Sequence, residues 1–319
     1  MELIYNILQA TFFTMTPLLV VALGGLFSER SGVVNIALEG IMVMGAFIGI
    51  FVISMIEGGS IPGQLVLIIG VIVGGLVGLI FSVFHAFASI NLKADQTISG
   101  TALNIFAPAV AIFVARSMLG GSKEIKFLTV FRIKRVPFLT DIPILGRIFF
   151  EDFYITFYVG LIILLISWFV LYKTRLGLRI RACGENPHAA DSVGINIYKI
   201  RYIGVLTSGF LAGMGGVIFI ISASQAFAAS VSGYGFLAIA VLIFGNWQPK
   251  KILFASFFFG LMTTLAAMYT EIPLLKGLGL SEEFYNMIPY IATLVVLALL
   301  SKSSKAPKAV GVIYDKGAR

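Results

Sequence analysis

Long apolar runs constrain this chain more than any other feature, because about 20 consecutive apolar residues cross a bilayer as one helix. Hydrophobic residues make up 59% of the 319 residues and charged residues only 12%, so no soluble core could hide the apolar surface. The sequence therefore predicts an all-α fold, a polytopic transmembrane helical bundle of about nine spans, within a range of about eight to ten. The runs lie at 6–26, 35–56, 63–90, 97–119, 153–173, 201–222, 234–246, 252–269 and 284–301.

The seventh run, 234–246, is too short to cross the bilayer alone. It must either recruit 231–233 or form a broken, partly re-entrant helix, since non-helical backbone inside a membrane is tolerated where protein buries it. We expect a transmembrane domain over 1–301 that consists of two pseudo-repeated halves with broken helices. Glycines spaced four apart at 70, 74 and 78, with the pairs 45/49 and 209/213, predict close helix packing.

Lysine and arginine cluster at 173–201, at 246–251 and in the tail beyond 301. Because cytoplasmic loops of membrane proteins are enriched in these residues, we place all three clusters at the cytoplasm, together with Arg30 and Lys93. The stretch 174–200 is then a cytoplasmic loop, and 302–319 is a basic cytoplasmic tail that we expect to be disordered. The N-terminus lies outside. The same count makes 120–152 an external loop, although six basic residues lie there.

Composition excludes several classes of function. The net charge of +8 reflects the cytoplasmic loops, so we expect membrane lipid around the helices and no nucleic-acid partner. The single cysteine, Cys183, excludes an intrachain disulfide and a multi-cysteine metal site. The dipeptide Gly-Lys never occurs, which excludes a Walker A nucleotide site. We therefore predict that the chain is not an enzyme and has no catalytic residue, metal or cofactor of its own.

Two polar segments inside the apolar runs are candidates for lining a pathway. Asn35 and Glu39 are four residues apart, so a helix there shows both on one face. A carboxylate at membrane depth costs about 3 kcal/mol unless it is paired or hydrated. Glu39 thus indicates either a water-lined pathway or a helix start stabilised by the helix dipole. Thr97, Thr101 and Asn104 share another face, and they either line the pathway or form interhelical hydrogen bonds.

The loop 174–196 contains a predicted short helix. Asn186 can cap its start, Pro187 suits its first turn and Gly194 suits its end. The result is a rigid helix of about two turns that is flanked by arginines. Such a helix is either a docking element for another protein or part of an ordinary basic loop.

The loop motif resembles the coupling loop of ABC-importer permeases in the branched-chain amino acid, simple sugar and nucleoside group. The pattern is Gly-Glu-Asn-Pro-x-Ala-Ala-x-x-x-Gly-Ile at 184–195. Residues 29–40 resemble the N-terminal signature of that family, and 233–249 resemble its C-terminal half. The Asp-Ile-Pro segment at 141–146 is similar to an outside-loop feature of the nucleoside branch. Together these segments extend from 28 to 249.

The resemblance implies a division of labour among several subunits in the cytoplasmic membrane. Two permease subunits, which we expect to be different chains, enclose the pathway. A separate ATPase uses the ATP, and an extracellular substrate-binding lipoprotein delivers a nucleoside. ATPase coupling would fall on Gly184, Glu185, Asn186, Pro187, Ala189, Ala190 and Gly194. The translocation pathway would include Asn35, Glu39, Thr97, Thr101 and Asn104.

Alternatives to a nucleoside permease stay open. The same type of permease could carry simple sugars or branched-chain amino acids instead. An ion-coupled secondary transporter would need paired ionisable residues in the membrane, where only Glu39, His85 and Arg116 come near. A scaffold subunit without a pathway would also fit the abundant packing glycines. The basic residues of 120–152 could contact an acidic binding protein or lie on lipid headgroups.

Overall fold

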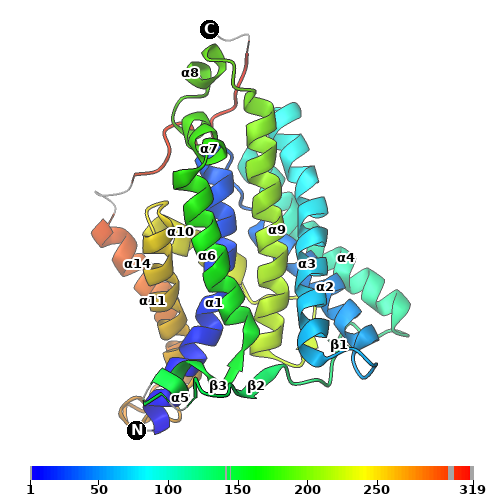
Figure 1. Cartoon of the computed structure of the whole chain (residues 1–319), viewed down its shortest axis with the longest axis vertical. Helices are drawn as coiled ribbons and strands as arrows, with labels where there is room; N and C mark the ends of the chain where they lie inside the picture. The colour runs from blue at the N-terminus through cyan, green and yellow to red at the C-terminus, as the bar shows by residue number, and fades with distance from the viewer. Residues whose placement is uncertain (1, 141, 144, 301–304, 317–319) are drawn as a thin grey trace.

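The computed structural model describes residues 2–140, 142–143, 145–300 and 305–316, and it consists mainly of helices (Figure 1). The long helices are α1 (Glu2–Arg30), α2 (Leu38–Ile56), α3 (Gly63–Ala86) with the π-helical turn η1 (Phe87–Asn91), α4 (Gln96–Met118), α6 (Ile155–Lys173), α9 (Ile197–Ala223) and α11 (Pro249–Ala267). The short helices are α5 (Leu145–Phe149), α7 (Arg175–Glu185), α8 (Pro187–Ser192), α10 (Tyr234–Phe244), α12 (Pro273–Lys276), α13 (Glu282–Asn286) and α14 (Ile288–Leu300). Strand β1 (Ile125–Lys126) pairs antiparallel with β4 (Ala226–Phe227), and β2 (Arg132–Arg135) with β3 (Glu151–Tyr154). The all-α prediction is confirmed.

Seven of the described helices are long and apolar enough to cross a membrane, and each coincides with a predicted run. The runs 234–246 and 284–301 correspond instead to α10 and α14, which have 11 and 13 residues. With 11 residues, α10 rises only about 16 Å, roughly half of the hydrocarbon thickness. The count of nine spans and the internal repeat therefore stay predictions.

The expected break before α10 is confirmed. Residues 228–233 are non-helical and lead from strand β4 into the bundle, where Ala229 and Val231 are buried. Ser232 and Gly233 then adopt left-handed conformations, with φ of 54° and 77°. A second break lies between α1 and α2, where 31–37 is non-helical. Backbone of this kind needs hydrogen-bond partners from the protein, so the two breaks locate the polar chemistry of the bundle.

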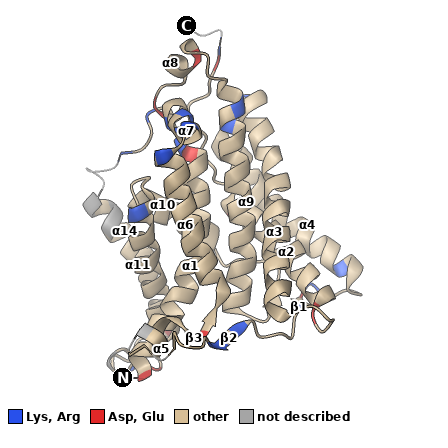
Figure 2. Cartoon of the chain, in the orientation of Figure 1, with Lys and Arg blue, Asp and Glu red and all other residues tan. Residues whose placement is uncertain are grey.

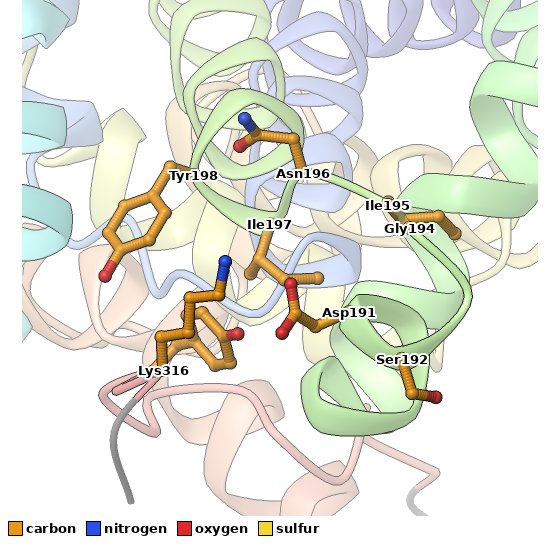
Figure 3. A pocket seen from close by; sticks show the side chains of 9 residues that line it. Asp191, Ser192, Gly194, Ile195, Asn196, Ile197, Tyr198 and Lys316 are labelled. Atoms are coloured by element: carbon orange, nitrogen blue, oxygen red, sulfur yellow. The ribbon is translucent and has the colours of Figure 1, made fainter.

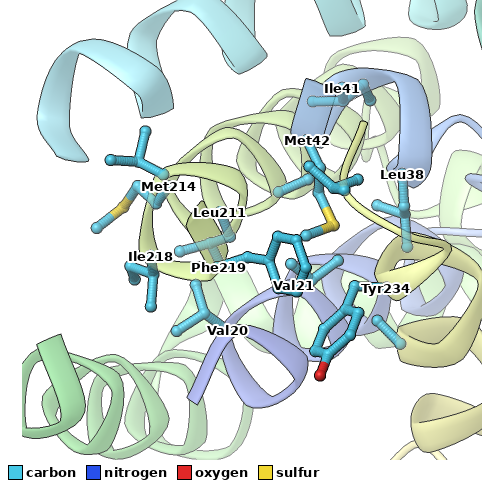
Figure 4. Packing of buried hydrophobic residues seen from close by; sticks show 14 of the residues in the cluster. Val20, Val21, Leu38, Ile41, Met42, Leu211, Met214, Ile218, Phe219 and Tyr234 are labelled. Atoms are coloured by element: carbon cyan, nitrogen blue, oxygen red, sulfur yellow. The ribbon is translucent and has the colours of Figure 1, made fainter. Parts of the chain in front are cut away.

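Helices α1 and α9 are the most buried of the long helices, and α2, α3 and α11 pack around them. Figure 4 shows Val20 and Val21 of α1, Met42 of α2 and Phe219 of α9 in one cluster with Tyr234 of α10. The centroids of the Phe219 and Tyr234 rings are 4.2 Å apart. The N-terminal end of the short helix α10 is thus anchored in the core of the bundle.

Glycines bring α2, α3 and α9 into backbone contact, as their spacing predicted. A Cβ atom on Gly45 of α2 or on Gly78 of α3 would overlap the backbone of α9, and one on Gly213 of α9 would overlap the backbone of α3. No larger residue fits at these crossings unless the helices separate. The three helices therefore form a close-packed unit on one side of α1.

Two of the predicted basic clusters, in 173–201 and in the C-terminal tail, lie toward one end of the molecule (Figures 1 and 2). Helices α7 and α8, the C-terminal end of α1 and residues 305–316 lie there, and Lys93 forms an ion pair with Asp315 at 2.8 Å. The N-terminus, α5 and strands β2 and β3 lie at the opposite end. That this end faces the cytoplasm stays a prediction, which rests on the accumulation of Lys and Arg on that side of membrane proteins.

The expectation of a disordered tail is wrong for 305–316. The Ala309 N–H donates to the Gly184 carbonyl at 2.8 Å. The Arg201 guanidinium donates to a tail carbonyl at 3.0 Å. Pro307, Ala309 and Tyr314 are buried, and the lysines between and beside them are exposed. The high charge of the tail suggested disorder and obscured this apolar pattern. Residues 302–304 and 317–319 lie outside the described part of the chain.

Acidic partners offset part of the basic charge in 120–152. Arg132 pairs with Asp152 at 3.0 Å, and Arg147 pairs with Glu2 at 2.8 Å. The Arg132 guanidinium also lies 5.3 Å from the centroid of the Phe13 ring. These arginines therefore serve the fold locally, which reduces the conflict between the charge of this segment and its predicted external position.

Candidate functional site

The helix predicted in the coupling loop is present as α8. The Asn186 side chain accepts a hydrogen bond from the Ala189 N–H at 3.0 Å and caps the helix. Pro187 occupies the first turn, and Gly194 follows the helix at a φ of 82°. The local signals in the sequence therefore gave the correct structure, because cap, first turn and end all depend on neighbours in the chain.

Helix α7 precedes α8 and was missed, although the sequence holds signals for it. The Thr174 hydroxyl accepts a hydrogen bond from the Gly177 N–H at 3.1 Å, which caps α7. Ile180 and Cys183 are three residues apart and are both buried. Burial raises the pKa of the Cys183 thiol to about 11. Its arginines made the segment resemble an ordinary basic loop, so its buried face was not predicted.

The seven predicted coupling residues divide into two groups. Three of them are buried: Gly184, Pro187 and Ala190. A Cβ atom on Gly184 would overlap the carbonyl of Arg30. The other four are exposed at the basic end: Glu185, Asn186, Ala189 and Gly194. The exposed group is available to a partner, and its contact with an ATPase stays a prediction.

A polar cavity of about 400 Å³ lies beside α8, where it meets α9 and the tail (Figure 3). Asp191 and Ser192 line it from α8, Asn196 and Tyr198 from the start of α9, and Lys316 from the tail. This cavity was not predicted from the sequence, because the tail was expected to be disordered. Helix α8 and the C-terminal segment therefore form one continuous surface.

Arg30 joins the coupling loop to the connection between α10 and α11. Its Nη1 atom lies 3.7 Å from the Glu185 carboxylate. Its Nε and Nη2 atoms donate to the Trp247 carbonyl at 3.2 and 2.8 Å. The neighbouring Glu29 accepts a hydrogen bond from the Trp247 indole at 2.5 Å. Two adjacent residues at the end of α1 thus hold both the main chain and the side chain of Trp247.

Side chains of α3 and α4 satisfy the backbone of the break at 31–37. Gln96 accepts from the Val34 N–H at 2.7 Å, and His85 donates to the Val34 carbonyl at 2.8 Å. Asn104 donates to the Ile36 carbonyl at 2.8 Å and accepts from a backbone N–H of α2 at the same distance. The interhelical alternative for Asn104 therefore describes its geometry, and a role in the pathway stays a prediction.

The remaining predicted pathway residues do not share one surface. Asn35 is buried and donates to the Ser208 hydroxyl at 2.8 Å, while its Oδ1 atom has no partner among the described residues. Thr97 and Thr101 are exposed on α4. Helix α4 is the least buried of the seven long apolar helices. The two threonines therefore lie on the periphery of the bundle, whereas Asn35 lies inside it.

Glu39 connects the two breaks. Its carboxylate accepts hydrogen bonds from the Gly233 N–H at 2.9 Å and the Gly235 N–H at 2.7 Å, at the start of α10. Such charge-assisted bonds, together with the positive end of a helix dipole, offset the cost of a carboxylate at this depth. The N-terminal end of α10 thus stabilises the Glu39 carboxylate. From the sequence, only the dipole of its own helix α2 could be suggested for this role.

A second cavity, of about 240 Å³, lies at the same end of α10. Ser232 and Tyr234 line it beside Thr263 of α11, Asn286 of α13 and Tyr290 of α14. The described lining residues offer hydroxyl, amide and aromatic groups and carry no charge. Sequence reasoning missed this group, because only the fold brings together residues spread over 232–290.

Comparison with known proteins covers nearly the whole chain. The family model described as "Branched-chain amino acid transport system / permease component" matches residues 7–297. The guanosine ABC transporter permease protein NupQ of Bacillus subtilis is 42% identical over 100% of this chain and 99% of its own. The nucleoside ABC transporter permease protein NupC of Lactococcus lactis is 41% identical over 94% of each chain. The putative glucose ABC transporter permease protein TsgC13 of Haloferax volcanii is 31% identical over 92% of this chain and 91% of its own. No solved structure gives a significant match.

The family match includes the coupling loop, both breaks and the cavity beside α10. The resemblance predicted from the motifs is therefore confirmed. The chain belongs to the permease family of branched-chain amino acid transport systems and is a multi-pass membrane permease subunit of an ABC importer.

Proposed function

We propose that this chain is the permease through which nucleosides enter the cell, powered by ATP hydrolysis on a separate ATPase. The observation that carries the proposal is the similarity to guanosine and nucleoside permeases along the chain, at 42% and 41% identity. The chain has no Walker A sequence, which supports hydrolysis on another subunit. It needs no cofactor of its own, because transport requires only a change of access across the membrane.

The ATPase docks on α7 and α8 at the cytoplasmic end. Glu185, Asn186 and Ala189 are exposed there on a capped and rigid element. The seat of this element on Arg30 and on the tail allows it to transmit a displacement to the bundle. Movements of the ATPase during its nucleotide cycle then switch the pathway between outward and inward access.

The chemistry of the cavity beside α10 supports a neutral substrate. A nucleoside combines an aromatic base with hydroxyl groups, and the cavity offers tyrosine rings, hydroxyls and an amide without charge. A branched-chain amino acid carries an ammonium and a carboxylate, and an uncharged lining would leave both unpaired. Simple sugars are the second candidate, because one relative is named a putative glucose permease.

Uptake into vesicles that contain the reconstituted complex tests the substrate and the energy source together. Guanosine uptake should require ATP, and excess glucose or leucine should not compete. Uptake that survives ATP depletion but stops when the proton gradient collapses would favour a secondary transporter. Competition by glucose would favour the sugar alternative.

A substitution at the exposed face of α8 tests the docking site. Ala189→Arg should abolish co-purification of the ATPase from mild detergent, because a bulky cation then occupies the contact surface. Ala306→Arg is the matched control, since it places the same side chain on an exposed position of the tail at the same end. If both variants retain the ATPase, the docking assignment is wrong.

The other partners complete the importer. A second permease subunit, which we propose is a different chain, encloses the pathway, and an extracellular lipoprotein delivers the nucleoside to the end formed by 120–152. Two differently tagged copies of this chain can be expressed with the other subunits. Purification by one tag should then leave the second copy behind. Recovery of both tags would mean that the chain pairs with itself.

A further inference from the structure

Three segments that are far apart in the sequence meet at the cytoplasmic end of α1. Arg30 contacts Glu185 of the coupling loop at 3.7 Å and the Trp247 carbonyl at 2.8 Å, with Glu29 on the Trp247 indole. Both Glu29 and Trp247 are buried, at 7% and 5% exposure. A contact that reaches from an exposed docking loop into the bundle is suited to pass on a displacement, because its buried end cannot relax into solvent.

Helix α10, which lies just before Trp247 in the chain, has a sharp bend at each end. Before α10, Ser232 and Gly233 adopt left-handed conformations with φ of 54° and 77°. After α10, Asn246 and Trp247 do the same with φ of 48° and 51°. A left-handed conformation is unfavourable for a non-glycine residue, and such residues occur where a structure fixes a sharp change of direction. Helix α10 is therefore a short rigid rod between two sharp bends.

The two ends of α10 have different neighbours. Its C-terminal end is tied through Trp247 to Arg30 and thus to the coupling loop. Its N-terminal end is held by Glu39 and borders the uncharged cavity with Ser232 and Tyr234. A tilt of α10 about either bend would change the width of this cavity. Helix α10 therefore lies between the proposed docking surface and the uncharged cavity that is proposed to accept the substrate.

We propose that Arg30 is the positioning residue that couples the ATPase-docking loop to α10, and through α10 to the cavity at its far end. This inference rests on the proposed docking of the ATPase at α8. When the ATPase displaces Glu185, the Arg30 guanidinium moves with it and shifts Trp247. The planar fork of arginine can donate to a carbonyl with two nitrogens while it faces a carboxylate, whereas a lysine ammonium holds no such fixed geometry.

The experiment uses the complete transporter with a cysteine in the cavity, Ser232→Cys. The native Cys183 thiol is buried, and its pKa is raised to about 11, so a water-soluble maleimide at pH 7 reports the introduced thiol. Labelling of the permease chain is compared without nucleotide and with ATP plus vanadate. We expect the two rates to differ about tenfold, within the range usual for coupled sites. Ser224→Cys, exposed in the segment after α9, should label equally in both states.

Substitution of Arg30 then separates coupling from docking. In Arg30→Gln the two labelling rates of Ser232→Cys should become equal, while the ATPase still co-purifies and hydrolyses ATP. Arg30→Lys keeps a cation opposite Glu185 but loses the two-nitrogen contact with Trp247, so it should also lose the difference. It carries the test if Arg30→Gln does not fold.

Several results would overturn the coupling role of Arg30. A nucleotide-dependent rate that persists in both variants would mean that α10 moves without Arg30. Equal rates in the parent Ser232→Cys complex would mean that α10 does not move. Loss of the ATPase from both variants would make Arg30 a docking residue instead. Failure of the proposed function is distinguishable, because it appears as absent ATPase or absent guanosine uptake in the unmodified complex.

Discussion

Several polar side chains inside this bundle serve the backbone of the two breaks. Asn104 is a clear case, because one amide pairs with both the Ile36 carbonyl and the Gly40 N–H. The helical spacing in the sequence placed Asn104 on a polar face of its helix. It could not separate a pathway residue from an interhelical hydrogen bond, because the partners lie 68 and 64 residues away.

Replacing Asn104 tests this structural role. Asn104→Leu leaves two backbone groups without their partner, and each such loss costs about 1–3 kcal/mol. We expect the free energy of unfolding, measured by denaturant titration in detergent, to fall by about 2–4 kcal/mol. Thr101→Val lies on the same helix at an exposed position and should change it by less than about 0.5 kcal/mol. Equal losses in the two variants would argue against the assignment.

The thiol of Cys183 gives a prediction about reactivity and topology. Burial raises its pKa to about 11, and the thiolate is the reactive form. Maleimide labelling of the native protein at neutral pH should therefore be slow from both sides of the membrane, with a rate that rises only as the pH approaches 11.

Cys183 is thus a poor reporter of orientation, and an exposed position is needed. When the chain is expressed without its ATPase, Ala189→Cys should label rapidly in inverted vesicles and remain unlabelled by an impermeant maleimide in intact cells. Rapid labelling in intact cells would reverse the predicted orientation of the basic end.

Among the elements, α8 and α10 mark the limit of what local sequence predicts. The cap, first turn and end of α8 depend on residues within one or two turns, so Asn186, Pro187 and Gly194 indicated the helix correctly. The run 234–246 likewise indicated a broken span, because its length was insufficient. The partner that stabilises the break is Glu39, 194 residues away from Gly233, and no local pattern could identify it.

The seat of α10 on Glu39 leads to a test at Gly235. A Cβ atom there would overlap the backbone of Glu39, so Gly235→Ala must push α10 away from α2. We expect a loss of about 1–3 kcal/mol in the free energy of unfolding and a clear fall in guanosine uptake. Gly63→Ala is the control, because its nearest neighbour would be 3.6 Å away, an ordinary contact. Unchanged uptake in Gly235→Ala would show that the position of α10 is not critical for transport.

The overall architecture was predictable where one physical constraint, such as the thickness of the bilayer, acts on the whole chain. The bilayer selects long apolar helices and the membrane orients positive loops, so the all-α bundle and the grouping of basic segments followed from composition and spacing. The helix crossings at glycine followed as well. The C-terminal segment was not predictable, because its order depends on contacts with Gly32, Gly184 and Arg201 in distant parts of the chain.

These contacts make 305–316 a brace between the coupling loop and the bundle. Ending the chain after residue 304 would free the Gly184 carbonyl and remove the Val312 carbonyl from Arg201, which is only 2% exposed. Loss of a partner by a buried charged group costs about 3–5 kcal/mol. We expect the shortened chain to reach the membrane, since the core of α1, α2, α3 and α9 excludes the tail. Its ATPase co-purification and guanosine uptake should both fall sharply.

A chain that ends after residue 316 is the matched control, because it keeps every described contact of the brace. It should bind the ATPase and transport guanosine as the full chain does. If the chain ending at 304 also does so, the bundle alone positions α7 and α8. The seat of the coupling loop then reduces to Arg30 with Glu185, and to the close approach of Gly184 to the end of α1.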